Sequence, residues 1–222
     1  MNDYTEQTKI ELRQANRILS FDKRFWLRRE MLKINPKNSL ETALNMIQSE
    51  NYAYLYGIKS SVREKNLRVA GSLLRSLLES TANAHWLIRD KTGKRAGKYV
   101  DSVQDFTDYV NETGNKNTFT IDNLPREAST WTTSSAEDRI NSFSPQAKVV
   151  WDYCSIFTHA SPSYLALNEG ADKVLNYVVS QANTYALTAR YLIKSSTDVY
   201  DKREKKFLDT MANELLRKHG IA

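Results

Sequence analysis

Apolar residues recur every three or four positions along most of this chain, and this spacing restricts its fold more than any other feature. No segment alternates between apolar and polar residues as a half-buried strand does. The chain also has only seven glycines and four prolines in 222 residues, so few positions force the backbone out of a helix. We therefore expect an all-α protein, a bundle of about six to eight helices.

The chain should form one domain over residues 1–222, because a chain of this length buries a complete core. Between about 111 and 144 it is rich in Thr, Ser and Asn and has no clean period, which predicts a long polar connection inside that domain. The expected parts are an N-terminal helix, a bundle core in two pieces and the polar connecting segment, at 1–35, 36–110 with 145–222, and 111–144.

Prolines and capping residues place the first helix boundaries. The N-terminal helix should end ahead of Pro36, because the residue before a proline is pushed out of the helical region. A second helix should begin at Asn38 or Ser39, where Glu41 follows Asn38 as in a capping box. The third helix, over about 62–90, is apolar on most of its circumference, which predicts a central place in the bundle.

Glycine, serine and proline mark the later boundaries. Gly93 and Gly97 interrupt the helical pattern, and a short helix should follow them. Ser144 and Pro145 are typical of an N-cap followed by the first residue of a helix. The polar connection should contain one short helical segment. The helices expected in this half of the chain cover 99–110, 136–143, 145–160, 170–197 and 202–218.

Composition also bears on the compartment and on cofactors. The single cysteine, Cys154, has no disulfide partner, which fits a reducing compartment. The first residues lack the apolar core of a signal peptide, and the apolar runs are too short to span a membrane, so we expect a soluble cytoplasmic protein. One cysteine and three histidines do not favour a metal site, and neither standard glycine-rich phosphate loop is present, so no cofactor is expected.

Polar side chains interrupt two apolar helices at helical spacing. Arg75 and Glu79 are one turn apart on the third helix, and Ser155 and His159 share a face of a later helix. If these helices pack together, the four residues form a cluster. The cluster can be a hydrogen-bonded network that fixes packing, with Glu79 or Asp152 accepting from His159. Alternatively, it is an acid–base site in which His159 moves a proton and Arg75 stabilises an anion.

Two short segments resemble a family of uncharacterised bacterial helical domains. They are the Arg-x-x-x-Glu helix of Leu74–Glu79 and the Ser-x-x-x-His helix within Tyr153–Pro162. That family is similar in plan to the HEPN superfamily, the higher eukaryote and prokaryote nucleotide-binding domains. Many HEPN proteins are metal-independent ribonucleases of toxin–antitoxin and antiviral systems. The resemblance thus implies a HEPN-like fold and a role in prokaryotic or phage defence or counter-defence.

This chain departs from the usual HEPN signature, in which four to six residues separate an arginine from a histidine on one helix. Asp152, Tyr153 and Cys154 stand at the positions that would hold the arginine. Arg75 could supply a guanidinium from the other helix. The resemblance therefore implies a ribonuclease only through an unusual pairing of Arg75 with His159.

A basic segment follows the third helix. It carries five cations that are opposed there only by Asp90, namely Arg89, Lys91, Lys94, Arg95 and Lys98. Such a patch can bind phosphates or acidic protein surfaces, or it can be a solvated connection between helices.

Three functions remain open from the sequence. The first is a HEPN-like binding domain without established catalysis, whose ligand is RNA, a nucleotide or a partner protein. The second is a metal-independent ribonuclease toxin that uses His159 with Arg75. The third is a structural homodimer, which the aromatic and basic residues of the first helix favour. These residues are Trp26, Arg24, Arg28 and Arg29.

Overall fold

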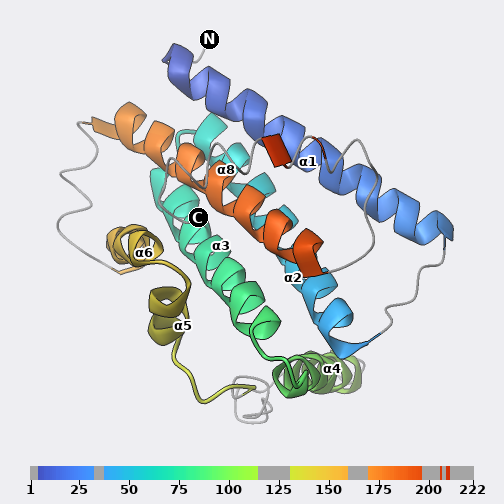
Figure 1. Cartoon of the computed structure of the whole chain (residues 1–222). Coiled ribbons are helices and arrows are strands. Elements are labelled where there is room, and N and C mark those ends of the chain that lie inside the picture. The colour runs from blue at the N-terminus through green and yellow to red at the C-terminus, as the bar shows by residue number, and fades with distance from the viewer. Residues whose placement is uncertain are drawn as a thin grey trace.

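The computed structural model describes residues 5–32, 38–114, 131–159, 170–196, 206 and 209–210. These residues form seven helices and no strand, which confirms the expected all-α bundle of six to eight helices (Figure 1). The helices are α1 (Glu6–Leu32), α2 (Ser39–Arg63), α3 (Leu67–Ile88), α4 (Lys94–Gly114), α5 (Ala136–Phe143), α6 (Pro145–Thr158) and α8 (Ala171–Ser196).

The central helix of the bundle is α3. It packs against α2, α8, α6 and α5, as its apolar circumference predicted. Figure 1 shows α2, α3 and α8 side by side, with α1 along one side of them and α5 and α6 along the other. At the lower end of the bundle α4 crosses beneath them and contacts α2. The C-terminal end of α3 therefore lies where α4 begins, and its earlier turns lie against α6.

Two clusters of buried side chains hold the bundle together. The larger joins α1, α2, α3, α5, α6 and α8, and it includes Leu74, Phe157 and Tyr185. The smaller joins α2, α3, α4 and α8, and it includes Leu87 and Tyr99. Burial of apolar surface stabilises a fold by about 25 cal/mol per Å², so these clusters are the main source of stability.

A glycine sets the distance between α3 and α6. A β-carbon on Gly71 would lie 2.2 Å from the ring of Phe157, closer than real side chains approach each other. The Phe157 ring is itself buried. Because no side chain separates the two helices here, α6 approaches α3 closely. Polar residues on the neighbouring turns of both helices thereby come within hydrogen-bonding distance.

Several predicted boundaries are confirmed. The side chain of Asn38 accepts a hydrogen bond from the N–H of Glu41 at 2.9 Å, and α2 begins at Ser39. Ser144 caps α6, and Pro145 is the first residue of that helix. The short helix predicted within the polar connection is α5, at the expected residues. The predicted helix over 170–197 is α8, which agrees to within one residue at each end.

The predicted start of the third helix is wrong. The preceding helix ends at Arg63, and Lys65 has a left-handed backbone with φ of 56°. The side chain of Asn66 then accepts a hydrogen bond from the N–H of Val69, which begins a separate helix at Leu67. Asparagine at this position provides a start signal that outweighs the continuous apolar spacing.

The helix predicted over 99–110 is present, but it is longer than expected. Helix α4 begins at Lys94, contains Gly97 and continues to Gly114, at the start of the expected polar connection. A glycine inside a helix costs only about 1 kcal/mol relative to alanine, which capping and packing can offset. The predicted helix over 202–218 lies almost entirely outside the described residues.

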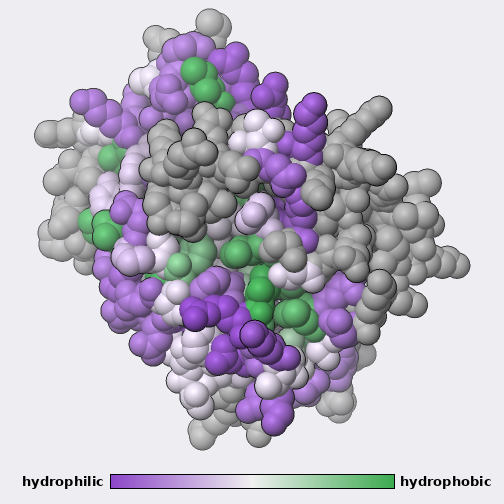
Figure 2. Space-filling model, viewed as in Figure 1, coloured by the Kyte–Doolittle hydropathy of each residue, from purple (hydrophilic) through white to green (hydrophobic). Residues whose placement is uncertain are grey.

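The described surface is mainly hydrophilic. On the face shown in Figure 2, most of the coloured residues are hydrophilic, and an apolar area lies near the centre of the view. Exposed large apolar side chains are scattered over four helices, at Ile10, Tyr56, Val69 and Val149. Within the ranges that the structure describes, no helix is long and apolar enough to cross a bilayer.

Candidate nucleic-acid interface

Arg75 connects α3 to α6 through a set of polar contacts that we call the α3–α6 seam. Its Nε donates to Glu79 Oε1 at 3.2 Å, and its Nη1 donates to Ser155 Oγ at 3.0 Å and to Thr158 Oγ1 at 3.1 Å. The guanidinium lies 4.2 Å from the centre of the Trp151 ring. The indole Nε1 of Trp151 donates to the same Glu79 oxygen at 2.8 Å. The expected packing of the two polar faces therefore occurs.

His159 does not join this seam. Helix α6 ends at Thr158, and His159 is the C-cap residue, with an extended backbone at φ −102° and ψ 153°. The side chain is exposed, and its imidazole has no hydrogen bond or ion pair within the described part of the chain. Helical spacing placed His159 over Ser155, but the helix ends one residue too early for that alignment to hold.

The expected acceptors for His159 have other partners. Lys148 Nζ donates to Asp152 Oδ2 at 2.6 Å within α6, and it lies 3.2 Å from Glu137 Oε1 of α5. Glu79 accepts from Arg75 and Trp151. Of the four residues predicted to cluster, the structure brings together Arg75, Glu79 and Ser155.

Arg139 on α5 forms a second polar connection, which sequence analysis missed. Its Nε donates to Asn83 Oδ1 of α3 at 2.7 Å, and its Nη1 donates to the carbonyl of Ser134. The guanidinium lies 5.2 Å from the centre of the Trp131 ring, which contacts Tyr99 of α4 edge-on at 5.0 Å. Burial lowers the pKa of Arg139, and the nearby Glu79 carboxylate opposes that shift. These contacts join α3, α4 and α5 in one region.

We define the basic turn as residues 89–98, from the end of α3 to the second turn of α4. Asp90 lies near its start. Its carboxylate accepts from the N–H and the hydroxyl of Thr92, at 3.0 and 2.7 Å, and from the N–H of Arg95 at 2.8 Å. These bonds lower the pKa of Asp90 to about 2. Gly93 has a φ of 71°, which lets the chain reverse into α4. The Asp90 carboxylate therefore caps the first turn of α4.

The cations of the basic turn divide into two kinds. Four are exposed, and within the described residues none of them forms an ion pair: Arg89, Lys91, Lys94 and Lys98. Arg89 makes only a long hydrogen bond to the Ser142 hydroxyl, at 3.5 Å. Arg95 is partly buried, because its guanidinium lies 3.8 Å from the centre of the Trp86 ring and its Nη1 donates to the Trp86 carbonyl at 3.1 Å. Of the five predicted cations in the basic turn, four are therefore exposed and one is partly buried.

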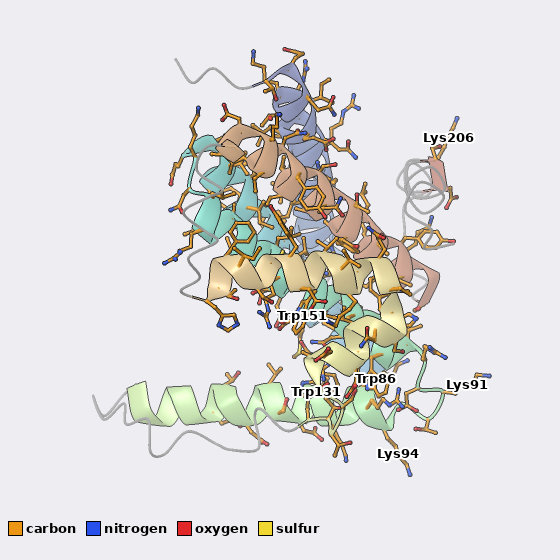
Figure 3. The ribbon with its side chains drawn as sticks, turned by 90° about the vertical axis from the view of Figure 1, so that its left-hand side faces the viewer. Trp86, Lys91, Lys94, Trp131, Trp151 and Lys206 are labelled. Atoms are coloured by element: carbon orange, nitrogen blue, oxygen red, sulfur yellow. The ribbon has the colours of Figure 1, made fainter. Side chains whose placement is uncertain are left out.

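Three tryptophan rings, each with an arginine over it, lie on one side of the molecule. Figure 3 shows Trp151, Trp131 and Trp86 on this side, with Lys91 and Lys94 at the end where α3 meets α4. Lys206 lies apart from them, at the upper right of the view. Exposed cations beside aromatic rings are typical of surfaces that bind nucleic acids.

A metal site, a reactive cysteine and a homodimer interface find less support among the described residues. No three His, Cys, Asp or Glu side chains there are grouped as metal ligands would be. Burial raises the pKa of the Cys154 thiol to about 12, so this cysteine stays protonated and unreactive. The side chains of Arg24, Trp26, Arg28 and Arg29, which favoured a homodimer, lie outside the described residues.

Comparison with known proteins adds no identification. No family model, no curated protein and no solved structure matches this chain. The resemblance to the HEPN superfamily therefore stays a prediction, and the function has to be inferred from the residues and their geometry.

Proposed function

We propose that the chain is a helical RNA-binding domain without catalysis, and that its contact surface is the basic turn. The observation that carries this proposal is that Arg89, Lys91, Lys94 and Lys98 are exposed and form no ion pair with any described residue. The only acidic residue of the turn, Asp90, is occupied by the start of α4. A row of exposed cations without acidic partners attracts the phosphates of a nucleic acid and releases their counterions on binding.

The neighbouring aromatic residues favour RNA over an acidic protein as the ligand. Arg95 is stacked on Trp86 beside the exposed lysines, and the Arg139–Trp131 pair lies on the same side. Nucleic acids offer both phosphates and flat bases, whereas an acidic protein surface offers mainly charge. The HEPN resemblance also supports RNA or a nucleotide, and the prokaryotic or phage defence setting belongs to the same proposal.

The geometry of the α3–α6 seam favours binding over cleavage. Arg75 makes three hydrogen bonds and lies over an indole ring, as expected of a residue that fixes packing. A ribonuclease that pairs Arg75 with His159 is the alternative, favoured by one observation. Thr158, which contacts Arg75, immediately precedes His159.

The proposal is tested by measuring the binding of a fluorescein-labelled RNA by anisotropy at several salt concentrations. Replacing Lys91, Lys94 and Lys98 together with alanine should weaken binding and make the slope of log K against log salt about 2 units shallower. A matched control removes three exposed cations elsewhere, Arg17, Lys173 and Lys206.

The control variant has the same change in net charge, so it separates a local contact from a general effect of charge. It should bind RNA nearly as well as the wild type. Equal loss in both variants, or no binding by the wild type at low salt, would refute RNA binding by the basic turn.

A further inference from the structure

Contacts with described residues hold Arg95 of the basic turn in a fixed orientation. Its backbone N–H donates to Asp90 Oδ2 at 2.8 Å, and its Nη1 donates to the Trp86 carbonyl at 3.1 Å. The distance of 3.8 Å from the guanidinium carbon to the centre of the Trp86 ring fits contact across the face of the ring. One side of the guanidinium is therefore covered by an indole.

Of the five N–H donors of this guanidinium, the contacts with described residues occupy one. Arg95 is partly exposed, and in the part of the chain that the structure describes no carboxylate accepts a hydrogen bond from its side chain. A guanidinium is planar and weakly hydrated, so a flat aromatic group can stack on it. An arginine already stacked on tryptophan loses little conformational freedom when a base is added.

We infer that the basic turn binds unpaired RNA, with one base stacked on the outer side of the Arg95 guanidinium and the flanking phosphates contacted by Lys91 and Lys94. This inference rests on the proposed function and names the form of RNA. Bases within a duplex are stacked on each other, so only a single strand, a loop or a bulge can offer one to Arg95. Phosphate contacts alone would not distinguish unpaired RNA from a duplex.

The first test compares three labelled RNAs at one salt concentration: a 12-nucleotide single strand, its duplex and the same strand without bases. The single strand should bind the wild type at least about fivefold more tightly than the strand without bases, which is the lower end of the contribution of one stacked base. Equal binding of the single strand and the strand without bases would overturn the inference and leave the proposed function intact. Failure of all three to bind would refute the proposed function itself.

The second test uses Arg95→Lys, which keeps the charge and removes the planar group. This variant should lose about fivefold in affinity for the single strand and little for the strand without bases. The matched control is Arg89→Lys, the same change at an exposed arginine of the same turn that contacts no ring of the described residues. This control should discriminate between the two RNAs as the wild type does. Unchanged discrimination by Arg95→Lys would overturn the inference.

Arg95 also contributes to the start of α4, so the variant could fail to fold, which thermal melting would show. In that case the wild type is crosslinked to a single strand that contains 4-thiouridine, and the modified peptide is identified by mass spectrometry. A crosslink within residues 86–98 supports the inference. A crosslink confined to other peptides overturns it.

Discussion

The ring of Phe157 occupies the space that a β-carbon on Gly71 would need. Its Cδ2 atom lies only 2.2 Å from the position of that β-carbon. This contact brings α6 close enough to α3 for Arg75 to reach Ser155 and Thr158. Close packing and the polar seam therefore depend on each other, and a change at the glycine should disturb both.

Gly71→Ala should destabilise the protein by about 1–3 kcal/mol, because the added methyl group overpacks a buried contact. Gly97→Ala is the matched control, since no described residue lies within 4 Å of the β-carbon that it adds. That change lies inside α4 and should stabilise the protein by up to about 1 kcal/mol. Urea unfolding of both variants measures these differences. Equal effects at the two positions would contradict the close approach of α3 and α6.

Trp151→Phe should cost about 1 kcal/mol of stability beyond the loss of ring area, because Glu79 loses the N–H that donates to it. The control is Trp131→Phe, which makes the same change where, within the described residues, the indole N–H has no hydrogen bond. A double-mutant cycle with Glu79→Gln isolates the pair. Additive effects of Trp151→Phe and Glu79→Gln would show that the bond contributes nothing.

His159→Ala should change stability by less than about 0.5 kcal/mol, because the side chain is exposed and lies outside the seam. If the chain only binds RNA, neither the wild type nor this variant should cleave a labelled RNA in the presence of a chelator. Cleavage by the wild type that is lost in an equally stable His159→Ala protein would establish the ribonuclease alternative instead.

Glu50 should make the stability depend on pH above the ordinary carboxyl pKa of 4.5. Its carboxylate accepts from the Ser80 hydroxyl at 3.2 Å, and burial raises its pKa above the ordinary value of 4.5. A raised pKa means that the folded state holds the proton more tightly than the unfolded state. Glu50 therefore contributes most stability at low pH, and that contribution falls as the pH rises through the folded-state pKa.

Glu50→Gln cannot lose a proton and serves as the comparison for this effect. The wild type should gain stability relative to Glu50→Gln when the pH is lowered from 8 to 5, as measured by thermal or urea unfolding at each pH. A stability difference between the two proteins that is the same at both pH values would show that Glu50 has an ordinary pKa.

Sequence analysis predicted most helices because their boundaries are set by neighbouring residues. Asn38, Ser144 and Pro145 act on the N–H groups of the next turn, so their effect can be read locally. The shared face of Arg75 and Glu79 was predicted for the same reason, since both lie on one helix, and the structure pairs them.

Features that depend on distant contacts were missed. Gly97 stays helical within a helix that Asp90 caps and Tyr99 anchors in the core, and the glycine alone suggested a break. The contacts of Arg139 with Asn83 and Trp131 arise in a segment without a clean period, so no pattern pointed to them. His159 was misplaced because the alignment required one more residue of helix than α6 contains.

The hydrogen bonds of Asp90 affect which residues of the basic turn can be substituted during evolution. Its carboxylate completes the first turn of α4 from within the chain, so the helix does not need an outside anion at that end. The exposed side chains of Lys91, Lys94 and Lys98 are therefore not needed to stabilise this helix end. Substitutions at 91, 94 and 98 should therefore change the stability little. Under the proposed function, the charge of the basic turn can then change one side chain at a time while the native state is kept.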